Sequence, residues 1–573
     1  MCYYIGRMGR ANINNNKRKS KLKSYLLLLL FVFLGITTYF LVSDRTSTVS
    51  AINFLFSSKT AAVEYETFDI YLEDIDEEYS SKIKENLEKI QFQEKPRFRF
   101  TEKKKRADII LKYGTGEGAL FTEFLLPVGH MYWIKDRILS TDLLEGEYKV
   151  LLNEQSYGKY SEFLKSKYPN INVEKSKSLL TDLGNEECNC IGLIEDNELT
   201  KEFKLLKMDD KYYLDTFEGA IEISLEAYSQ RKDINMGFVS NIIKRNMGVK
   251  DIEFNEENVA KVNMTGVTAM ARRVALAMDM RKNYTYPAEK IAAFLSDADL
   301  THTSNEVSFV DGCNAYTGMR FCSPPQSIET LKAIGVDVIE LTGNHNNDFG
   351  SKYNTQTIEK YKEEGIAYFG GGLNIEDASK PYITEVDGTT ISFLGYNYYD
   401  AIVAGGSNAL ARENSAGANA YSEEKMEKDI EGLRESTDII IVDFQFQECY
   451  SYPSGDVIYP VCYKPINNQT SVFRKAIDYG ADIVVGTQAH QPQTYELYKD
   501  GVIFYGLGNL FFDQSMWIGT RQGMVLTHYF KEGALIQTKI TPTIYDRSLQ
   551  VEVANEKDSQ LLLELLSTAR ESL

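Results

Sequence analysis

Polar side chains that could bind a metal ion or transfer a proton follow several apolar segments in the second half of the chain. These segments end in the sequences TGNH (342–345), FQFQE (444–448), TQAH (487–490) and GLGN (506–509). Carboxylates, amide oxygens and imidazoles can together hold Mn, Fe or Zn, and the metal makes a bound water nucleophilic near neutral pH. Three of the five histidines lie at or near such ends: His302, His345 and His490. We therefore expect one cleft where these segments meet.

The segments themselves predict an α/β fold from about residue 258 onward. Short β-rich runs such as VDVIEL and DIVVG alternate with helical stretches such as IETLKAIG and TIEKYKEEG. Near-continuous apolar strands separated by helices indicate a sheet that is buried on both faces. In such folds, ligand sites gather at the carboxyl ends of the strands, which is where the polar groups stand in this sequence.

The order of the motifs in this region resembles the CapA family of poly-γ-glutamate capsule-biosynthesis proteins. The segments that carry the resemblance are TGVTAMARRV, LTGNHNNDFG, FQFQECY and GTQAHQPQTYELYKDGVIFYGLGNLFFDQ. In that family one strand ends in Gly-Asp, a later one in Asn-x-Glu, and the next in Asn-His-x-x-Asp-x-Gly. His-Trp-Gly, Gly-His-x-Pro-His and Leu-Gly-Asn-Phe then follow. The resemblance spans residues 258–535 and implies a four-layer α/β sandwich of the calcineurin-like metallophosphoesterase type.

The resemblance also implies roles for individual residues. His345 would be the acid or electrophile near the leaving group, and Asp348 would orient its imidazole. The implied metal ligands are Glu306, Asn344, His490 and Gln445. Four further residues would belong to the same cleft: Gln488, Glu448, Asn509 and Thr268.

Several of the family's ligands are missing from this chain. The family's Gly-Asp reads Gly266-Val267, with Thr268 as the nearest polar group. His-Trp-Gly reads Gln-Phe-Gln from Gln445, and Gly-His-x-Pro-His reads Gly-Thr-Gln-Ala-His up to His490. A dinuclear site needs an anionic bridge, and the first strand supplies none. We therefore expect at most one divalent metal ion (Mn, Fe or Zn), with Glu448 as a residue that could compensate.

Two hypotheses about function follow from these matches and losses. The first is a surface hydrolase or transferase that acts on a phosphorylated or γ-glutamyl polymer, with His345 as the acid-base group. The second is a non-catalytic capsule-assembly factor whose cleft binds the anionic polymer or other capsule-synthesis membrane proteins. The lost ligands favour the second hypothesis. The retained Asn344, His345, Asp348 and His490 favour the first.

The charge of the chain excludes nucleic acid as a partner. The formal net charge is −19 at pH 7, and residues 1–24 contain basic but no acidic residues, so the remainder is more acidic still. Such a body repels a phosphate backbone. A polyglutamate chain would also need local basic groups, for which Arg272, Arg273 and Arg521 are candidates.

An uncharged segment follows the basic tail of residues 1–24. Tyr25–Val42 is just long enough to cross the hydrocarbon core of a membrane as a helix. The basic residues before it predict a cytoplasmic tail, with both folded domains outside the cell. The alternative is a cleavable signal peptide, but no convincing small-x-small site directly follows the apolar run. We therefore expect a single-pass anchor in the cell membrane.

The remaining sequence suggests a stalk, a further α/β domain and a terminal extension. Residues 43–64 are rich in Ser and Thr, as in a stalk. Residues 65–255 alternate strand-like runs such as FDIYL with helical runs such as SSKIKENLEKIQ, which is an α/β pattern. This part resembles the two-lobed periplasmic solute-binding domains. Residues 536–573 would be a C-terminal extension.

The seven cysteines are compatible with a location outside the cell. Cys313 and Cys322 flank one short loop, and the pair Cys449–Cys462 flanks another. Each pair could form a disulfide or remain as half-buried free thiols. The Cys-Asn-Cys spacing at residues 188–190 is predicted to be too tight for an easy bridge.

Overall fold

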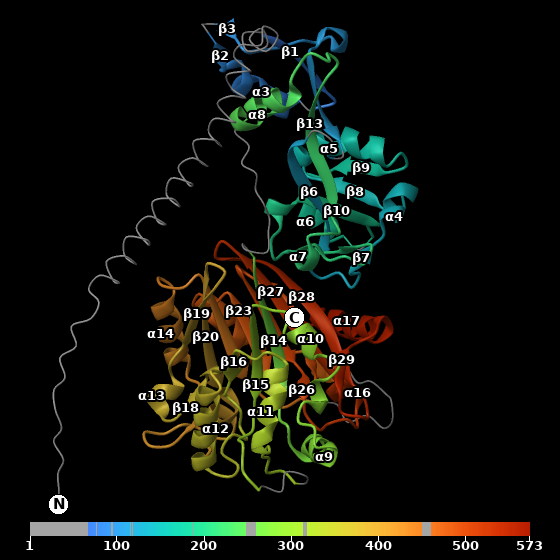
Figure 1. Cartoon of the computed structure of the whole chain (residues 1–573). Helices are drawn as coiled ribbons and strands as arrows, with labels where there is room; N and C mark the ends of the chain where they lie inside the picture. Colours follow the sequence, from blue (N-terminus) through green and yellow to red (C-terminus); the bar gives the residue numbers. More distant parts are fainter. Residues whose placement is uncertain are drawn as a thin grey trace, which may run out of the picture. The chain divides into compact units, whose positions relative to one another are not determined.

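The structure is a computed structural model, and it describes residues 67–573 apart from 76, 93–94, 115, 117–118, 186, 248–258, 313–317 and 450–459. Its contacts divide the chain into two compact units (Figure 1), one of Met1–Phe121 with Ser224–Lys250 and one of Thr122–Ile223 with Asp251–Leu573. Both units contain helices and strands, so the predicted α/β class is confirmed. The predicted domain border near residues 255–258 stays a prediction.

The predicted membrane anchor Tyr25–Val42 lies outside the described residues. Among the helices that the structure does describe, none is both long and apolar enough to cross a membrane. The predicted stalk of residues 43–64 also precedes the first described residue.

The smaller unit is built around a short parallel sheet. Strand β1 pairs in parallel with β4 and β5, and β13 pairs antiparallel with β5 from Ser224 onward. The side chain of Asn235 accepts a hydrogen bond from the amide of Phe238 and thereby caps helix α8. The elements are β1 (Phe68–Glu73), α3 (Glu77–Glu88), β4 (Phe98–Phe100), β5 (Ile109–Gly114), β13 (Ile221–Ser229) and α8 (Met236–Asn246).

Residues 122–223 of the larger unit form a lobe around strand β6. Strand β10 is antiparallel to β6 and parallel to β8, β9 is parallel to β8, and β11 pairs with β6. Its apolar core includes Leu126 and Tyr213, and also Val259 and Tyr529 from the later part of the chain. This lobe therefore shares a core with residues 251–573. The elements are β6 (Ala119–His130), β8 (Lys149–Leu152), α5 (Glu154–Lys167), β9 (Asn172–Lys175), β10 (Cys190–Glu195) and β11 (Phe203–Leu205).

Residues 251–573 contain two large sheets. In the first sheet the strand order is β17-β16-β15-β14-β27-β28-β29, and β26 also pairs with β14. The strands from β14 to β17 are parallel, whereas β27, β28 and β29 are antiparallel to their neighbours. The bounds are β14 (Ala260–Thr268), β15 (Leu300–Asn305), β16 (Val338–Glu340), β17 (Ala367–Phe369), β26 (Asn509–Phe511), β27 (Gln522–Lys531), β28 (Ala534–Tyr545) and β29 (Val551–Val553). Residues 536–573, predicted as an extension, thus contribute strands to this sheet.

The second sheet has the order β19-β20-β22-β23-β25-β24. The strands β20, β22, β23 and β25 are parallel, and β19 and β24 are antiparallel strands at the two edges. The bounds are β19 (Tyr382–Val386), β20 (Thr389–Asn397), β22 (Ile439–Gln445), β23 (Ile483–Thr487), β24 (Pro492–Tyr498) and β25 (Gly501–Leu507).

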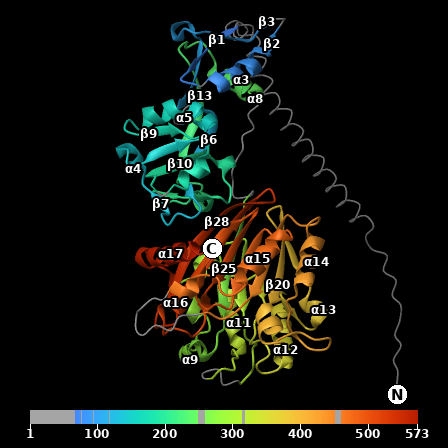
Figure 2. The ribbon, with the colours of Figure 1, turned by 180° about the vertical axis from the view of Figure 1, so that it is seen from behind.

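The two sheets face each other across an apolar core. Val262, Leu300 and Val338 of the first sheet pack in the same cluster as Ile441 and Phe504 of the second. The outer face of the first sheet is covered by four helices: α9 (Arg272–Arg281), α10 (Ala292–Leu295), α11 (Ile328–Ala333) and α12 (Ser351–Glu363). The outer face of the second is covered by α14 (Glu423–Leu433) and α15 (Gln469–Asp478), seen from behind in Figure 2. The result is four layers, helices–sheet–sheet–helices.

Two disulfides are formed in the described part of the chain. Cys449 is bonded to Cys462, in agreement with one of the two predicted alternatives. Cys188 is bonded to Cys190, which corrects the prediction that this spacing is too tight. Their Cα atoms are 5.1 Å apart, inside the range that a disulfide can bridge. Cys322 is disulfide-bonded too, and its predicted partner Cys313 lies outside the described residues.

Candidate functional site

The parallel strands of the two sheets bring several predicted site residues together. Glu306 directly follows β15, Asn344 lies four residues beyond the end of β16, and Gln445 is the last residue of β22. In register, Ser304 pairs with Glu340, and Gln445 pairs with Thr487, the residue before Gln488. The carboxyl ends of strands from both sheets therefore meet at one edge of the sandwich.

The side-chain amide of Gln445 connects this group. Its Nε2 atom lies 3.1 Å from Oδ1 of Asn344 and 3.4 Å from Oε1 of Glu306, and it also donates to Oε1 of Gln488. Its Oε1 accepts a hydrogen bond of 3.0 Å from Nδ2 of Asn397, at the end of the neighbouring strand β20. Gln445, Gln488 and Glu306 are all buried. We name Glu306, Asn344, Gln445 and Gln488 the carboxamide cluster.

Gly343 allows the turn after β16 to reach this cluster. A Cβ atom at position 343 would lie 2.6 Å from Cα of Glu306, closer than any real contact permits. Only glycine lets the two strand ends approach so closely. This close approach places Asn344 beside Glu306.

The predicted catalytic pair is formed on the same turn. Nδ1 of His345 lies 2.7 Å from Oδ2 of Asp348, and the same oxygen accepts a hydrogen bond of 2.7 Å from the amide of Phe321. The ring of Phe321 lies 4.3 Å from the imidazole, measured between centroids. Asp348 thus fixes the orientation of the imidazole. Because a carboxylate oxygen accepts, the Nδ1 atom of His345 carries the proton in this contact.

His490 is held by Asn509, one of the predicted cleft residues. Oδ1 of Asn509 lies 2.9 Å from Nδ1 of His490, and its Nδ2 donates to the carbonyls of His490 and Thr520 at 3.0 Å. His490 and Gln488 both have positive φ, 47° and 79°, which is rare for residues other than glycine. Such backbone strain is typical of functional sites.

Burial and neighbouring charges shift the acidity of two groups in the cleft. Burial lowers the pKa of His490 to about 4; the bond to Asn509 opposes the shift, and the nearby His345 and Arg272 reinforce it. Burial raises the pKa of Glu306 well above its usual value, and the charges of Glu340 and Glu448 raise it further. Both shifts favour the neutral form of the group.

Two predicted cleft residues lie outside the carboxamide cluster. Glu448 is exposed just beyond β22, where its charge still reaches Glu306. Thr268 is buried at the end of β14, where its hydroxyl lies 3.1 Å from that of Thr303 on the adjacent strand, and its carbonyl accepts the amide of Glu306. Thr268 thus supports the strand that carries Glu306.

The donor set does not fit a divalent metal ion. Within the described residues, no three His, Cys, Asp or Glu side chains lie close enough together to hold one. The cluster offers one carboxylate, Glu306, whose pKa is raised. The point where its oxygens converge is taken by an amide nitrogen of Gln445, which is a hydrogen-bond donor and no metal ligand.

Sequence reasoning missed two contributors to this cleft. Asn397 closes strand β20 and donates to Gln445, to the carbonyl of Thr342 and to Asp400. Its place at the end of an apolar strand is the same signal that identified Asn344. The aromatic rings of Phe321 and Phe512, which pack on His345 and His490, had no such signal because apolar residues are common everywhere in the chain.

A second polar cluster lies deeper between the two sheets. Nε2 of His302 lies 3.0 Å from Oδ2 of Asp443, and both side chains are fully buried. Glu340 is near them, and burial together with the charge of Asp443 raises its pKa to about 7. His302 was expected at or near a strand end, but it lies inside β15, stacked on Phe393 at 6.2 Å between ring centroids. We name His302, Asp443 and Glu340 the core cluster.

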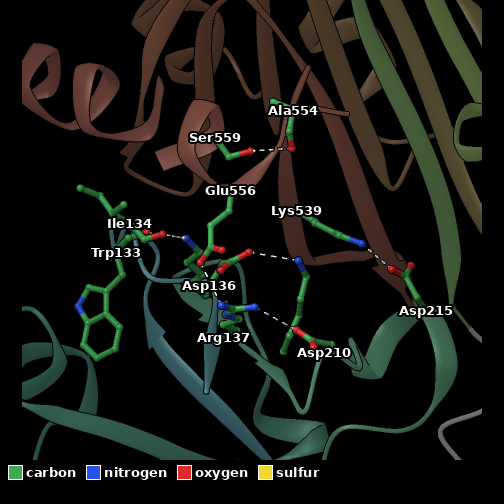
Figure 3. Close-up of polar contacts among 12 residues, drawn as sticks. Trp133, Ile134, Asp136, Arg137, Asp210, Asp215, Lys539, Ala554, Glu556 and Ser559 are labelled. Carbon is green, nitrogen blue, oxygen red and sulfur yellow. Dashed lines mark hydrogen bonds and ion pairs between the residues drawn. The ribbon is translucent and has the colours of Figure 1, made fainter. Parts of the chain in front are cut away.

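A cavity of about 770 Å³ lies elsewhere in the larger unit, between the lobe of residues 122–223 and the last strands and helix. Its charged side chains pair with one another (Figure 3): Arg137 contacts Asp210 and Glu556, and Lys539 contacts Asp215. Lys204 is half-buried and donates to the carbonyls of Trp133 and Ile134. The pairs Arg137–Glu556 and Asp215–Lys539 join the lobe to the sandwich.

Comparisons with known proteins point to capsule biosynthesis. Residues 261–514 match a family described as bacterial capsule synthesis protein PGA_cap. The chain is 26% identical over 309 residues to the capsule biosynthesis protein CapA of Bacillus anthracis, covering 52% of this chain and 71% of that protein. It is 27% identical over 218 residues to the PGA biosynthesis protein CapA of Bacillus subtilis, covering 38% of this chain and 53% of that protein.

Among solved structures, the similarities are weaker. The calcineurin-like phosphoesterase YfkN from Bacillus subtilis aligns at 11% identity with a TM-score of 0.29, covering 55% of this chain and 99% of that one. An ABC-type phosphate transport receptor from Vibrio cholerae aligns at 14% identity with a TM-score of 0.24, covering 31% and 94%. TM-scores this low do not establish a shared fold. The metallophosphoesterase type of the sandwich and the likeness of residues 65–255 to solute-binding domains therefore stay predictions.

Proposed function

We propose, from the premise that residues 261–514 belong to the bacterial capsule synthesis protein family, that this chain takes part in the biosynthesis of a poly-γ-glutamate capsule. The observation that carries the proposal is the family match itself. It spans all members of the carboxamide cluster together with His345, Asp348, His490 and Asn509. The family's sequence region and the cleft at the strand ends thus coincide.

The location that we propose is the outer face of the cell membrane. Tyr25–Val42 would anchor the chain, with the basic residues 1–24 in the cytoplasm and both folded units outside. Disulfides such as Cys449–Cys462 support an oxidising compartment. Protease added to intact protoplasts should then digest both units, whereas digestion only after lysis would contradict this orientation.

Within capsule synthesis, we propose that the cleft binds the anionic polymer or a membrane protein of the synthesis complex. The donor set around Gln445 supports binding over metal-dependent chemistry, because it offers one carboxyl group, Glu306, and an amide nitrogen occupies the point where the oxygens converge. Residues 65–255, with their solute-binding-like sequence pattern, would add a second binding element. The acidic net charge argues against nucleic acid as a partner.

A second candidate function is a hydrolase or transferase that acts on the polymer or on a phosphorylated substrate. The observation that favours it is the pair His345–Asp348, with 2.7 Å between Nδ1 and Oδ2 and only partial burial. An imidazole held by a carboxylate is the usual arrangement of a general acid or base. The divalent metal that the family resemblance implies would belong to this candidate function.

The test is a strain in which the gene for this chain is deleted and then restored. Deletion should abolish surface poly-γ-glutamate, measured as glutamate released by acid hydrolysis of washed cells, and the full chain should restore it. Restoration by His345→Ala as fully as by the native chain would exclude the hydrolase. An unchanged capsule in the deletion strain would contradict the proposed function itself.

A further inference from the structure

The carboxamide of Gln445 stands at the point where a cation would be expected. Three side-chain oxygens converge on its Nε2 atom: Oδ1 of Asn344 at 3.1 Å, Oε1 of Glu306 at 3.4 Å, and Oε1 of Gln488. An amide nitrogen carries two hydrogens and a partial positive charge, so it satisfies oxygens without being a metal ligand. The family resemblance places a histidine here, which would present a lone pair to a metal instead.

The orientation of this carboxamide is fixed from the opposite side. Nδ2 of Asn397 donates to Oε1 of Gln445 at 3.0 Å and is itself held by Asp400 and by the carbonyl of Thr342, both at 2.8 Å. Rotation of the Gln445 amide would set its NH₂ group against that of Asn397, and its single oxygen against the oxygens of Asn344 and Glu306. The hydrogen-bond network therefore keeps a donor pointing at the three oxygens.

A permanent positive charge lies at the same cleft. The guanidinium carbon of Arg272 is 4.8 Å from the ring centroid of Phe321 and 4.9 Å from that of Phe512. These two rings pack in turn on the imidazoles of His345 and His490, with centroids 4.3 and 5.0 Å apart. Arg272 donates from Nη2 to the carbonyl of Asp513, whose carboxylate lies 3.8 Å from Nε and balances part of the charge.

We infer that this cleft recognises a carboxylate group without a metal ion, because Gln445 fills the position of the cation and Arg272 supplies the positive charge. The planar guanidinium can hold a carboxylate through two parallel hydrogen bonds. The rings of Phe321 and Phe512, whose centroids are 5.7 Å apart, shield the guanidinium from water on the side where they pack and strengthen that contact. The identity of the ligand, a γ-linked glutamate chain, rests on the proposed function, whereas the replacement of the metal does not.

The first test measures metal in the full chain, purified in detergent without chelator. We expect substoichiometric Mn, Fe and Zn by mass spectrometry, and no rise of the melting temperature when Mn²⁺ is added. Gln445→Glu should turn the amide donor into a fourth oxygen ligand, so this variant should be less stable without metal and should be stabilised by Mn²⁺. One metal ion per wild-type chain, or stabilisation of the wild type by Mn²⁺, would overturn the inference.

The second test measures binding of a γ-linked glutamate trimer by calorimetry, with and without EDTA. We expect the same affinity in both conditions and a loss of about tenfold or more in Arg272→Gln. The matched control is Arg281→Gln, because Arg281 lies on the same helix and also stacks on a ring, that of Tyr286, at 4.1 Å. This control should bind as the wild type does.

The outcomes separate this inference from the proposed function. Binding that disappears in EDTA, or that is unchanged in Arg272→Gln, would overturn the inference even if the deletion strain lacks its capsule. No binding of the trimer, together with a lost capsule, would also overturn it and leave the role in capsule synthesis standing. Metal-independent binding that depends on Arg272 would support it.

Discussion

The sandwich contains two His–Asp pairs whose surroundings differ. Both are close, 3.0 Å for His302–Asp443 and 2.7 Å for His345–Asp348. The side chains of the first pair are fully buried, whereas those of the second are 15% and 18% exposed. The first pair is enclosed between two sheets, and the second lies on a turn beyond a strand end. The His302–Asp443 pair thus belongs to the packed core, whereas the His345–Asp348 pair is accessible to a ligand.

The same three strands carry both polar clusters of the sandwich. Glu306 comes four residues after His302, just beyond the end of β15, and Asn344 comes four residues after Glu340, the last residue of β16. In β22, Gln445 comes two residues after Asp443. Side chains two positions apart on a strand share a face, so Asp443 and Gln445 point to the same side of the second sheet. A residue of the core cluster and a residue of the carboxamide cluster are therefore only two to four positions apart in the sequence.

The largest expected effect comes from breaking the buried pair. Asp443→Ala should lower the free energy of unfolding by about 3–5 kcal/mol, because it leaves the imidazole of His302 without its partner in the core. Asp348→Ala is the matched change in the cleft and should cost about 1 kcal/mol, since its partner His345 can still reach water. Urea denaturation of both variants gives the comparison.

The double variant His302→Leu with Asp443→Leu sharpens this test. Replacing both partners by apolar groups removes the two buried polar side chains together, so most of the stability lost in Asp443→Ala should return. Equal losses in Asp443→Ala and Asp348→Ala would show that the two pairs do not differ as their burial suggests.

The next effect is a pH dependence that belongs to the core cluster. Burial raises the pKa of Glu340 to about 7, above the value in the unfolded chain. The contribution of Glu340 to the free energy of unfolding is therefore most favourable below about pH 4.5, where the carboxyl group is protonated in both states. That contribution should be lost as the pH rises toward 7, by up to about 3 kcal/mol. Stability curves of the wild type and Glu340→Gln between pH 4.5 and 7.5 should therefore diverge, with the wild type losing more. Parallel curves would contradict the assignment to Glu340.

Much of this arrangement could be predicted from the sequence, and the reason is strand geometry. Apolar runs that end in polar residues are enough to predict that Asn344, Gln445 and Gln488 meet at one edge of a sheet. The same pattern failed for His302, because the sequence shows that a histidine is close to a strand end but not how many residues the strand continues. The pairing of His302 with Asp443 joins positions of two different sheets, and no local pattern reports it.

The smallest effect on stability, and the clearest on function, is expected from His345→Ala. The imidazole is partly exposed and its loss leaves no large cavity, so the free energy of unfolding should change by less than about 1 kcal/mol. Asp348 would keep its hydrogen bond from the amide of Phe321 and so preserve the turn. Binding of the glutamate trimer should nevertheless weaken, because the imidazole packs on Phe321, the ring that also contacts Arg272. A variant that unfolds easily would instead place His345 with His302, as a part of the core whose exposure is incidental.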